Sequence, residues 1–196
     1  MQRFPRIFWA GLLGVGVVSC QSTGSQNAGD RVRPAYDKAT GQLKQLEFDS
    51  DGDGKVDTWG YMDGAKVVRV EVDEDGDGKV DRWEYHGDSA SAAAEQSTPD
   101  KTITRIERAT RHDGHVSRWE YFDRGSLARV EEDTDGDGKV DKWETYANGT
   151  LSMMAIDTER RGSPDRRLVY RPDGTLDRIE TDPTGSGKFQ PIPPAH

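Results

Sequence analysis

The stretch DEDGDGKVD at residues 73–81 sets the character of this chain, because near-copies occur as DSDGDGKVD at residues 49–57 and DTDGDGKVD at residues 133–141. Each copy carries aspartates at its first, third, fifth and ninth places and glycines at its fourth and sixth. Carboxylates this close together repel one another unless a cation lies between them. Ligands that are all oxygen favour a hard ion, and calcium is the first candidate.

The copies belong to a repeat with a period of 24 residues, which is the spacing from Asp49 to Asp73 and from Ala109 to Asp133. The step from Asp73 to Ala109 is longer, at 36 residues. The excess falls in an insertion of small residues at about 87–100, which predicts a surface loop. A short, fixed period is typical of a repeat array.

Each repeat also carries the pattern of a β-hairpin. Val68, Val70 and Val72 share one face of an expected strand, and the aromatic residues of a pair stand two apart and share a face as well. A glycine turn follows each aromatic pair and suits a tight hairpin. The apolar positions before the loops are Leu46, Val70, Ile106, Val130, Met154 and Ile179; the pairs are Trp59/Tyr61, Trp83/Tyr85 and Trp119/Tyr121; the turns are Asp63-Gly64, Arg124-Gly125, Asn148-Gly149 and Asp173-Gly174.

We therefore predict an all-β fold over residues 33–190. About eight residues separate a turn glycine from the next acidic loop, which is too short for a stable capped helix. The expected fold is a meander of short hairpins in 24-residue repeats, with calcium loops at one end and glycine turns at the other, and with Trp and Tyr stacked from unit to unit. Only 32% of the chain is hydrophobic, so bound metal is expected to contribute stability.

Two of the loops, with the residues that follow them, resemble the calcium loop of EF-hand proteins. That loop supplies oxygen from its first, third, fifth, seventh, ninth and twelfth places and turns at a glycine in the sixth. The resemblance implies that the seventh residue contributes its carbonyl, the ninth acts through water and the last glutamate binds through both oxygens. The implied ligands are Asp73, Asp75, Asp77, Lys79, Asp81 and Glu84 in one loop, and Asp133, Asp135, Asp137, Lys139, Asp141 and Glu144 in the other.

The remaining copies depart from this pattern. In the first copy Gly60 replaces the final glutamate, so weaker binding or a borrowed ligand is expected at Asp49, Asp51, Asp53, Lys55 and Asp57. The copy from Ala109 has Arg111, His115 and Ser117 at ligand places and is expected to be metal-free. The copy from Asp157 keeps Glu159 but carries Arg161 and Pro164 and is also expected to be empty, and the copy from Asp182 would be a poor site. In the copy from Ala109, Arg111 replaces a ligand by a fixed cation. The prediction is therefore two to three calcium ions.

The resemblance covers the loops alone, because a true EF-hand places a helix on each side and the flanks here are β-like. Thrombospondin type 3 repeats, which are Asp-rich and ordered by calcium, are similar in style. Residues 36–43 are similar to the tyrosine-aspartate repeats of bacterial surface proteins. The alternative is that the Asp-Gly strings are solvated turns without metal.

The N-terminal residues are typical of an export signal. Arg3 and Arg6 precede a short apolar stretch at residues 7–18. The sequence that ends at Cys20 resembles the bacterial lipobox, which implies a signal peptide at 1–19, lipid on Cys20 and a tether at 20–32. An ordinary secretory signal is the alternative. Because Gln21 is not aspartate, similarity to lipoproteins of two-membrane bacteria favours the outer membrane of the cell envelope. Residues 191–196 form a Pro-rich tail.

Composition and motifs restrict the function. A net charge of −9 argues against nucleic acid as a partner. The chain has no nucleophile motif, and its carboxylate clusters are explained as ion ligands, so we do not expect an enzyme. His112 and His115 could suggest a zinc site, but no clear third ligand accompanies them, and we expect solvated turn residues. The expected function is a structural or adhesive calcium module, and the alternative is a binding module for an envelope protein or glycan. The sequence does not indicate an oligomeric state.

Overall fold

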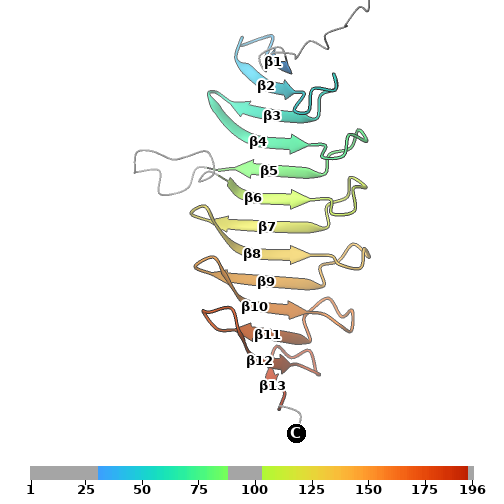
Figure 1. Cartoon of the computed structure of the whole chain (residues 1–196), viewed down its shortest axis with the longest axis vertical. Helices are drawn as coiled ribbons and strands as arrows, with labels where there is room; N and C mark the ends of the chain where they lie inside the picture. The colour runs from blue at the N-terminus through green and yellow to red at the C-terminus, as the bar shows by residue number, and fades with distance from the viewer. Residues whose placement is uncertain (1–30, 88–102, 194–196) are drawn as a thin grey trace, which may run out of the picture.

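The protein is a single open sheet of antiparallel strands (Figure 1). The computed structural model describes residues 31–87 and 103–193, and this part of the chain contains no α-helix, hence none long and apolar enough to cross a membrane. The predicted signal peptide, Cys20 and nearly all of the predicted insertion lie outside the described residues. The prediction of an all-β hairpin meander is confirmed.

The strands follow one another across the sheet in chain order, so every connection joins neighbours. They are β1 (Val32–Tyr36), β2 (Leu43–Phe48), β3 (Thr58–Asp63), β4 (Lys66–Val72), β5 (Arg82–His86), β6 (Ile103–Arg108), β7 (Arg118–Asp123), β8 (Ser126–Glu132), β9 (Lys142–Ala147), β10 (Thr150–Ile156), β11 (Arg166–Tyr170), β12 (Leu176–Thr181) and β13 (Gln190–Pro191).

The two ends of the hairpins differ, as Figure 1 shows. On one side, tight turns connect β3 to β4, β7 to β8 and β9 to β10. In the turn between β9 and β10, Asn148 and Gly149 both have positive φ, 52° and 78°, which glycine and asparagine tolerate best. Longer loops follow every even-numbered strand and stack along the opposite edge. We call them loop A (49–57), loop B (73–81), loop C (109–117), loop D (133–141), loop E (157–165) and loop F (182–189).

One face of the sheet, here the Trp face, alternates aromatic and charged residues across the strands. Trp59 of β3 pairs with Glu71 of β4, which in turn pairs with Trp83 of β5. In the neighbouring row Arg69 lies between Tyr61 and Tyr85. The expectation that Trp and Tyr stack directly between units is wrong for these strands, because each repeat contributes two strands and the second one carries Arg and Glu.

This alternation produces the same cluster three times on the Trp face. The Arg69 guanidinium lies 4.2 Å from the centre of the Tyr61 ring and 3.1 Å from Glu71, and the Tyr61 hydroxyl donates a 2.7 Å hydrogen bond to Glu71. Cation–π and cross-strand pairs of this kind each contribute about 0.5–1 kcal/mol at exposed sites. The other two clusters are Tyr85, Arg105 and Glu107, and Tyr121, Arg129 and Glu131.

The opposite face carries the predicted apolar positions in one row, interleaved with glutamates. Ile106 pairs with Glu84 on one side and Glu120 on the other, and Val130 lies between Glu120 and Glu144. No second layer covers this row in the described structure, and of its predicted apolar members only Ile106 and Val130 are buried. Among the described residues only Ile106, Ala109, Val130 and Ala155 are buried hydrophobics, against ten buried polar or charged residues. The sheet therefore depends on strand pairing and on its loops more than on a core.

Val130 tests how much that thin apolar row contributes. Its side chain is among the few that are fully buried, so Val130→Ala should lower the free energy of unfolding by about 2 kcal/mol. Val68→Ala is the matched control, because Val68 is exposed and its truncation should change stability by less than about 0.5 kcal/mol. Urea unfolding followed by tryptophan fluorescence measures both. Equal effects of the two substitutions would show that the row is not a core.

Candidate metal centre

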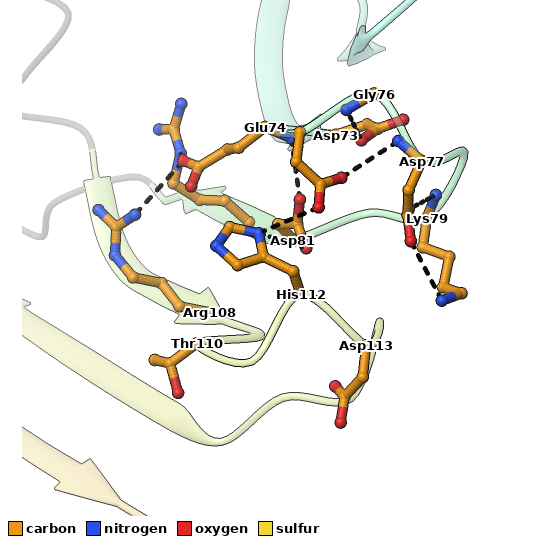
Figure 2. Close-up of polar contacts among 12 residues, drawn as sticks. Asp73, Glu74, Gly76, Asp77, Lys79, Asp81, Arg108, Thr110, His112 and Asp113 are labelled. Atoms are coloured by element: carbon orange, nitrogen blue, oxygen red, sulfur yellow. Dashed lines mark hydrogen bonds and ion pairs between the residues drawn. The ribbon is translucent and has the colours of Figure 1, made fainter.

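Loop B illustrates how the acidic loops are built (Figure 2). Asp73, at the end of β4, is 7% exposed, and its two carboxylate oxygens accept backbone N–H groups from Gly76 at 2.7 Å and Gly78 at 2.9 Å. The loop thus winds around this carboxylate. Gly78 has a φ of 91°, a conformation that residues with a side chain rarely adopt, so the repeated glycine is required for this winding.

The next carboxylates of loop B bend the chain in the same way. Asp75 Oδ1 accepts the N–H of Asp77 at 3.1 Å, and Asp77 Oδ1 accepts the N–H of Lys79 at 2.8 Å. The ninth residue, Asp81, closes the loop because its Oδ2 accepts the N–H of Glu74 at 3.0 Å. One oxygen of each of these three carboxylates is therefore held by the backbone. The other oxygen of Asp77 accepts a 3.1 Å hydrogen bond from Lys79 Nζ, and those of Asp75 and Asp81 lie 3.7 Å and 3.3 Å from His112 Nδ1.

Loops A and D repeat these contacts. Asp49 and Asp133 each accept two glycine N–H groups at 2.6–3.0 Å, and Asp57 and Asp141 each accept the N–H of the second loop residue. Within each loop, three carboxylates bring one oxygen apiece to within 4.8 Å of one another. These groups are Asp49, Asp51 and Asp53 in loop A, Asp73, Asp75 and Asp77 in loop B, and Asp133, Asp135 and Asp141 in loop D. Such clusters can hold a metal ion.

The predicted glutamate ligands lie elsewhere. Glu84 is on β5, where its carboxylate forms an ion pair with Arg82 and lies 3.8 Å from His86. Glu144 on β9 accepts hydrogen bonds from Lys142 and Tyr146, both at 2.8 Å. Neither belongs to the carboxylate groups above. A helix after the loop returns the twelfth residue of an EF-hand toward the ion, whereas here a strand carries it onto the sheet.

The lysines of the acidic loops are fixed by their amides. Lys55 and Lys79 donate their N–H groups to the fifth-place aspartates, and Lys139 does the same in loop D. The Lys79 ammonium also lies 3.1 Å from Asp77. The carbonyl ligands expected from these three residues remain a prediction.

Loops C and E carry cations in place of the acidic cluster, and both contact the acidic loops beside them. Arg111 of loop C donates a 2.9 Å hydrogen bond to the carbonyl of Asp133 in loop D. Arg160 of loop E contacts loop D from the other side, 2.8 Å from Asp135. His112 of loop C lies against loop B, 3.3 Å from Asp81 and 3.7 Å from Asp75. Each cationic loop therefore supplies positive charge to acidic neighbours.

From the sequence, Arg111 was expected to act within its own loop, and the contacts of His112 and Arg160 with neighbouring loops were not predicted. A signal was present at the fourth loop place, where loops A, B and D have glycine with positive φ but loops C and E have His112 and Arg160, with φ of 53° and 57°. A bulky residue in the left-handed conformation is uncommon and indicates a constraint from its surroundings. At both places the side chain contacts the third-place aspartate of the preceding loop.

Loops E and F retain the winding of the acidic loops with fewer acids. Burial by itself would raise the pKa of Asp182, which is 1% exposed, but the N–H of Gly187 and the hydroxyl of Thr184 outweigh it and the net pKa is lowered. The pKa of Asp157 is lowered by the same balance. Burial by itself would raise this pKa, but backbone N–H groups of Arg161 and Gly162 outweigh that effect. Both oxygens of Asp182 are bound by the chain itself, whereas Asp157 keeps one buried oxygen, Oδ1, without a hydrogen-bond donor among the described residues.

Comparison with known protein families and with curated proteins finds no match. The site is therefore interpreted from its own geometry.

Acid should destabilise loop F, because the pKa of Asp182 is lowered in the folded protein. A carboxyl whose pKa is lower in the folded state stabilises the fold above its unfolded pKa of about 4 and loses that effect as pH falls through the folded pKa. We expect the melting temperature in chelator to fall below about pH 4, with a shallower fall in Asp182→Asn, because the amide does not titrate. Thermal scans by circular dichroism between about pH 2.5 and pH 6 measure this. Parallel profiles for both proteins would contradict the assignment.

Proposed function

We propose that this protein is a calcium-binding, non-catalytic structural module of the bacterial envelope, in which ions bound by loops A, B and D stabilise a single-layer sheet. The observation that carries the proposal is the repeated cluster of three carboxylates within 4.8 Å, found at three places on one edge of the sheet. The scarcity of buried apolar side chains supports it, because another source of stability is needed.

Calcium fits these clusters better than other common ions do. The loops offer oxygen atoms in flexible, glycine-rich segments, and calcium accepts six to eight such ligands without strict geometry. An ion that binds the folded loops and not the unfolded chain stabilises the fold by mass action. Sites with dissociation constants of about 10⁻⁴–10⁻³ M are sufficient in extracellular surroundings.

Loops A, B and D differ in the cations that already surround them. Loop D has Arg111 and Arg160 from its neighbours, and loop B has His112. In loop A the Arg31 guanidinium donates a 2.9 Å hydrogen bond to the carbonyl of Ser50, and the nearest ammonium is that of Lys55 of the same loop, 3.9 Å from Asp53. Among the described residues, loop A therefore has no ion pair between its carboxylates and a neighbouring loop, and a bound ion would have more charge to balance there.

The location follows from the N-terminal motif. Lipid on Cys20 would hold the sheet at a membrane through the tether at 20–32, and the outer membrane is the proposed site. An adhesive role, with an envelope protein or glycan as partner, is the second candidate. The open Trp face favours it, because its tyrosine, arginine and glutamate clusters are only partly buried and repeat along the sheet. Aromatic and arginine side chains of this kind are enriched in binding surfaces.

Calcium titration tests the proposed function directly. The full, untagged chain in detergent should bind two to three ions by calorimetry. Asp77→Ala and Asp137→Ala should each remove one, because each deletes the fifth-place carboxylate of a loop. Asp113→Ala is the matched control, since Asp113 holds the same place in loop C but has no second acid beside it within that loop. Unchanged stoichiometry in both loop variants, or an equal loss in the control, would refute the ligand assignment.

The lipid anchor has its own test. Cys20→Ala should remove the acylation site and shift the protein from the membrane fraction to the soluble fraction of its bacterial host, because a lipid anchor is required for stable attachment. Fractionation with labelled palmitate measures both. Membrane attachment that survives the substitution would contradict the proposed anchor and leave calcium binding unaffected.

A further inference from the structure

His112 brings a nitrogen ligand to loop B from a different loop. It lies at the fourth place of loop C, and Figure 2 shows its ring directed at the carboxylates of loop B. Its Nδ1 atom is 3.3 Å from Asp81 Oδ1 and 3.7 Å from Asp75 Oδ2. The stacking of adjacent repeats thus unites residues that are more than 30 positions apart in the sequence.

These separations suit ligands of one small ion. Zinc binds imidazole nitrogen and carboxylate oxygen at about 2.0–2.2 Å, so two ligand atoms on the same ion are about 3.0–3.5 Å apart. The observed separations between the three side chains need only a small closure to meet this range, and one ligand atom from each already lies within 4.8 Å of the other two.

A second, independent feature points to a ligand at this place. The Asp81 side chain is 1% exposed, and although its Oδ2 accepts the Glu74 N–H, its Oδ1 accepts no hydrogen bond. A buried carboxylate oxygen without a donor is costly, and such atoms in native proteins call for an explanation such as a bound ion. Oδ1 is the atom that faces His112, and the 3.3 Å ion pair with His112 Nδ1 is the contact that the structure gives it.

Loop D provides the contrast. Arg160 occupies the place of His112, with a similar φ, and its guanidinium lies 2.8 Å from Asp135, the counterpart of Asp75. A guanidinium is permanently charged and has no lone pair, so it can neutralise Asp135 but cannot ligate a metal. A neutral imidazole at the same place offers a lone pair on Nδ1.

We propose that Asp75, Asp81 and His112 bind a borderline divalent transition-metal ion of the Zn²⁺ class, which distinguishes loop B from the purely oxygen-lined loops A and D. Imidazole with carboxylate suits such ions, whereas calcium takes oxygen alone. The inference rests on the proposed metal-binding role of loop B and specifies its ion. Solvent completes the coordination, since the His112 side chain is half exposed.

Zinc titration of the full, untagged chain in detergent tests the proposal, with Co²⁺ absorption as a readout of coordination by nitrogen. One zinc ion should bind with His112-dependent affinity and displace calcium from one loop only. His112→Ala and His112→Gln should both weaken zinc binding at least about tenfold, the second while keeping a side chain that can hydrogen-bond to Asp81. Calcium stoichiometry in both variants should remain that of the parent, which also shows that they fold.

Two matched variants sharpen the test. His115→Ala removes the exposed histidine of the same loop, which contacts Asp113 alone among the described acids, and should leave zinc binding unchanged. Arg160→His copies the loop B arrangement into loop D and should raise the zinc stoichiometry from one to two. Absence of saturable zinc binding, or full affinity in His112→Ala, overturns the inference. If calcium still binds then, the proposed function stands; if zinc binds as described and calcium does not bind at all, the proposed function fails alone.

Discussion

Repulsion among clustered carboxylates is the constraint on which this structure depends. In loops A, B and D three oxygens from different aspartates approach within 4.8 Å. A pair of unit charges at that distance repels by about 1 kcal/mol in water and about 3.5 kcal/mol at the lower effective dielectric near a protein surface. A cross-strand pair contributes about 0.2–1 kcal/mol. The three repulsions in one loop therefore outweigh several favourable pairs on the adjoining strands.

The fold meets this constraint in two ways. Loops C and E contribute the permanent cations Arg111 and Arg160 and the titratable His112 to their acidic neighbours, and backbone N–H groups surround the first aspartate of each acidic loop. The number and position of these cationic side chains and N–H groups are set by the fold. Loop A has no cationic loop on its N-terminal side within the described residues, and a dissolved divalent ion can supply the remaining charge there. Because cationic loops C and E lie beside acidic loops B and D, the stability of the array depends on ions without every repeat depending on them.

The sequence predicted those features that are written within one repeat. Valines at alternate places defined β4, the glycine dipeptides placed the turns, and the aspartate pattern located the loops. Features that arise between repeats were harder to predict. The pairing of Trp59 with Glu71 depends on the register of two strands, and the approach of His112 to Asp81 depends on the stacking of two loops. Glu84 matched a motif whose geometry requires a helix. Here Glu84 lies on a strand, and its carboxylate forms an ion pair with Arg82 of the same strand.

Thermal unfolding at constant ionic strength, in excess chelator and in millimolar Ca²⁺, tests the central claim most directly. If divalent ions relieve the repulsion in the loops, millimolar calcium should raise the melting temperature of the sheet by a few degrees, since a ligand concentration of one to ten times Kd gives about 0.4–1.4 kcal/mol of linkage at each site. Magnesium at the same concentration should have a smaller effect, because it gives up its water reluctantly. Identical unfolding curves in chelator and in calcium would contradict the account.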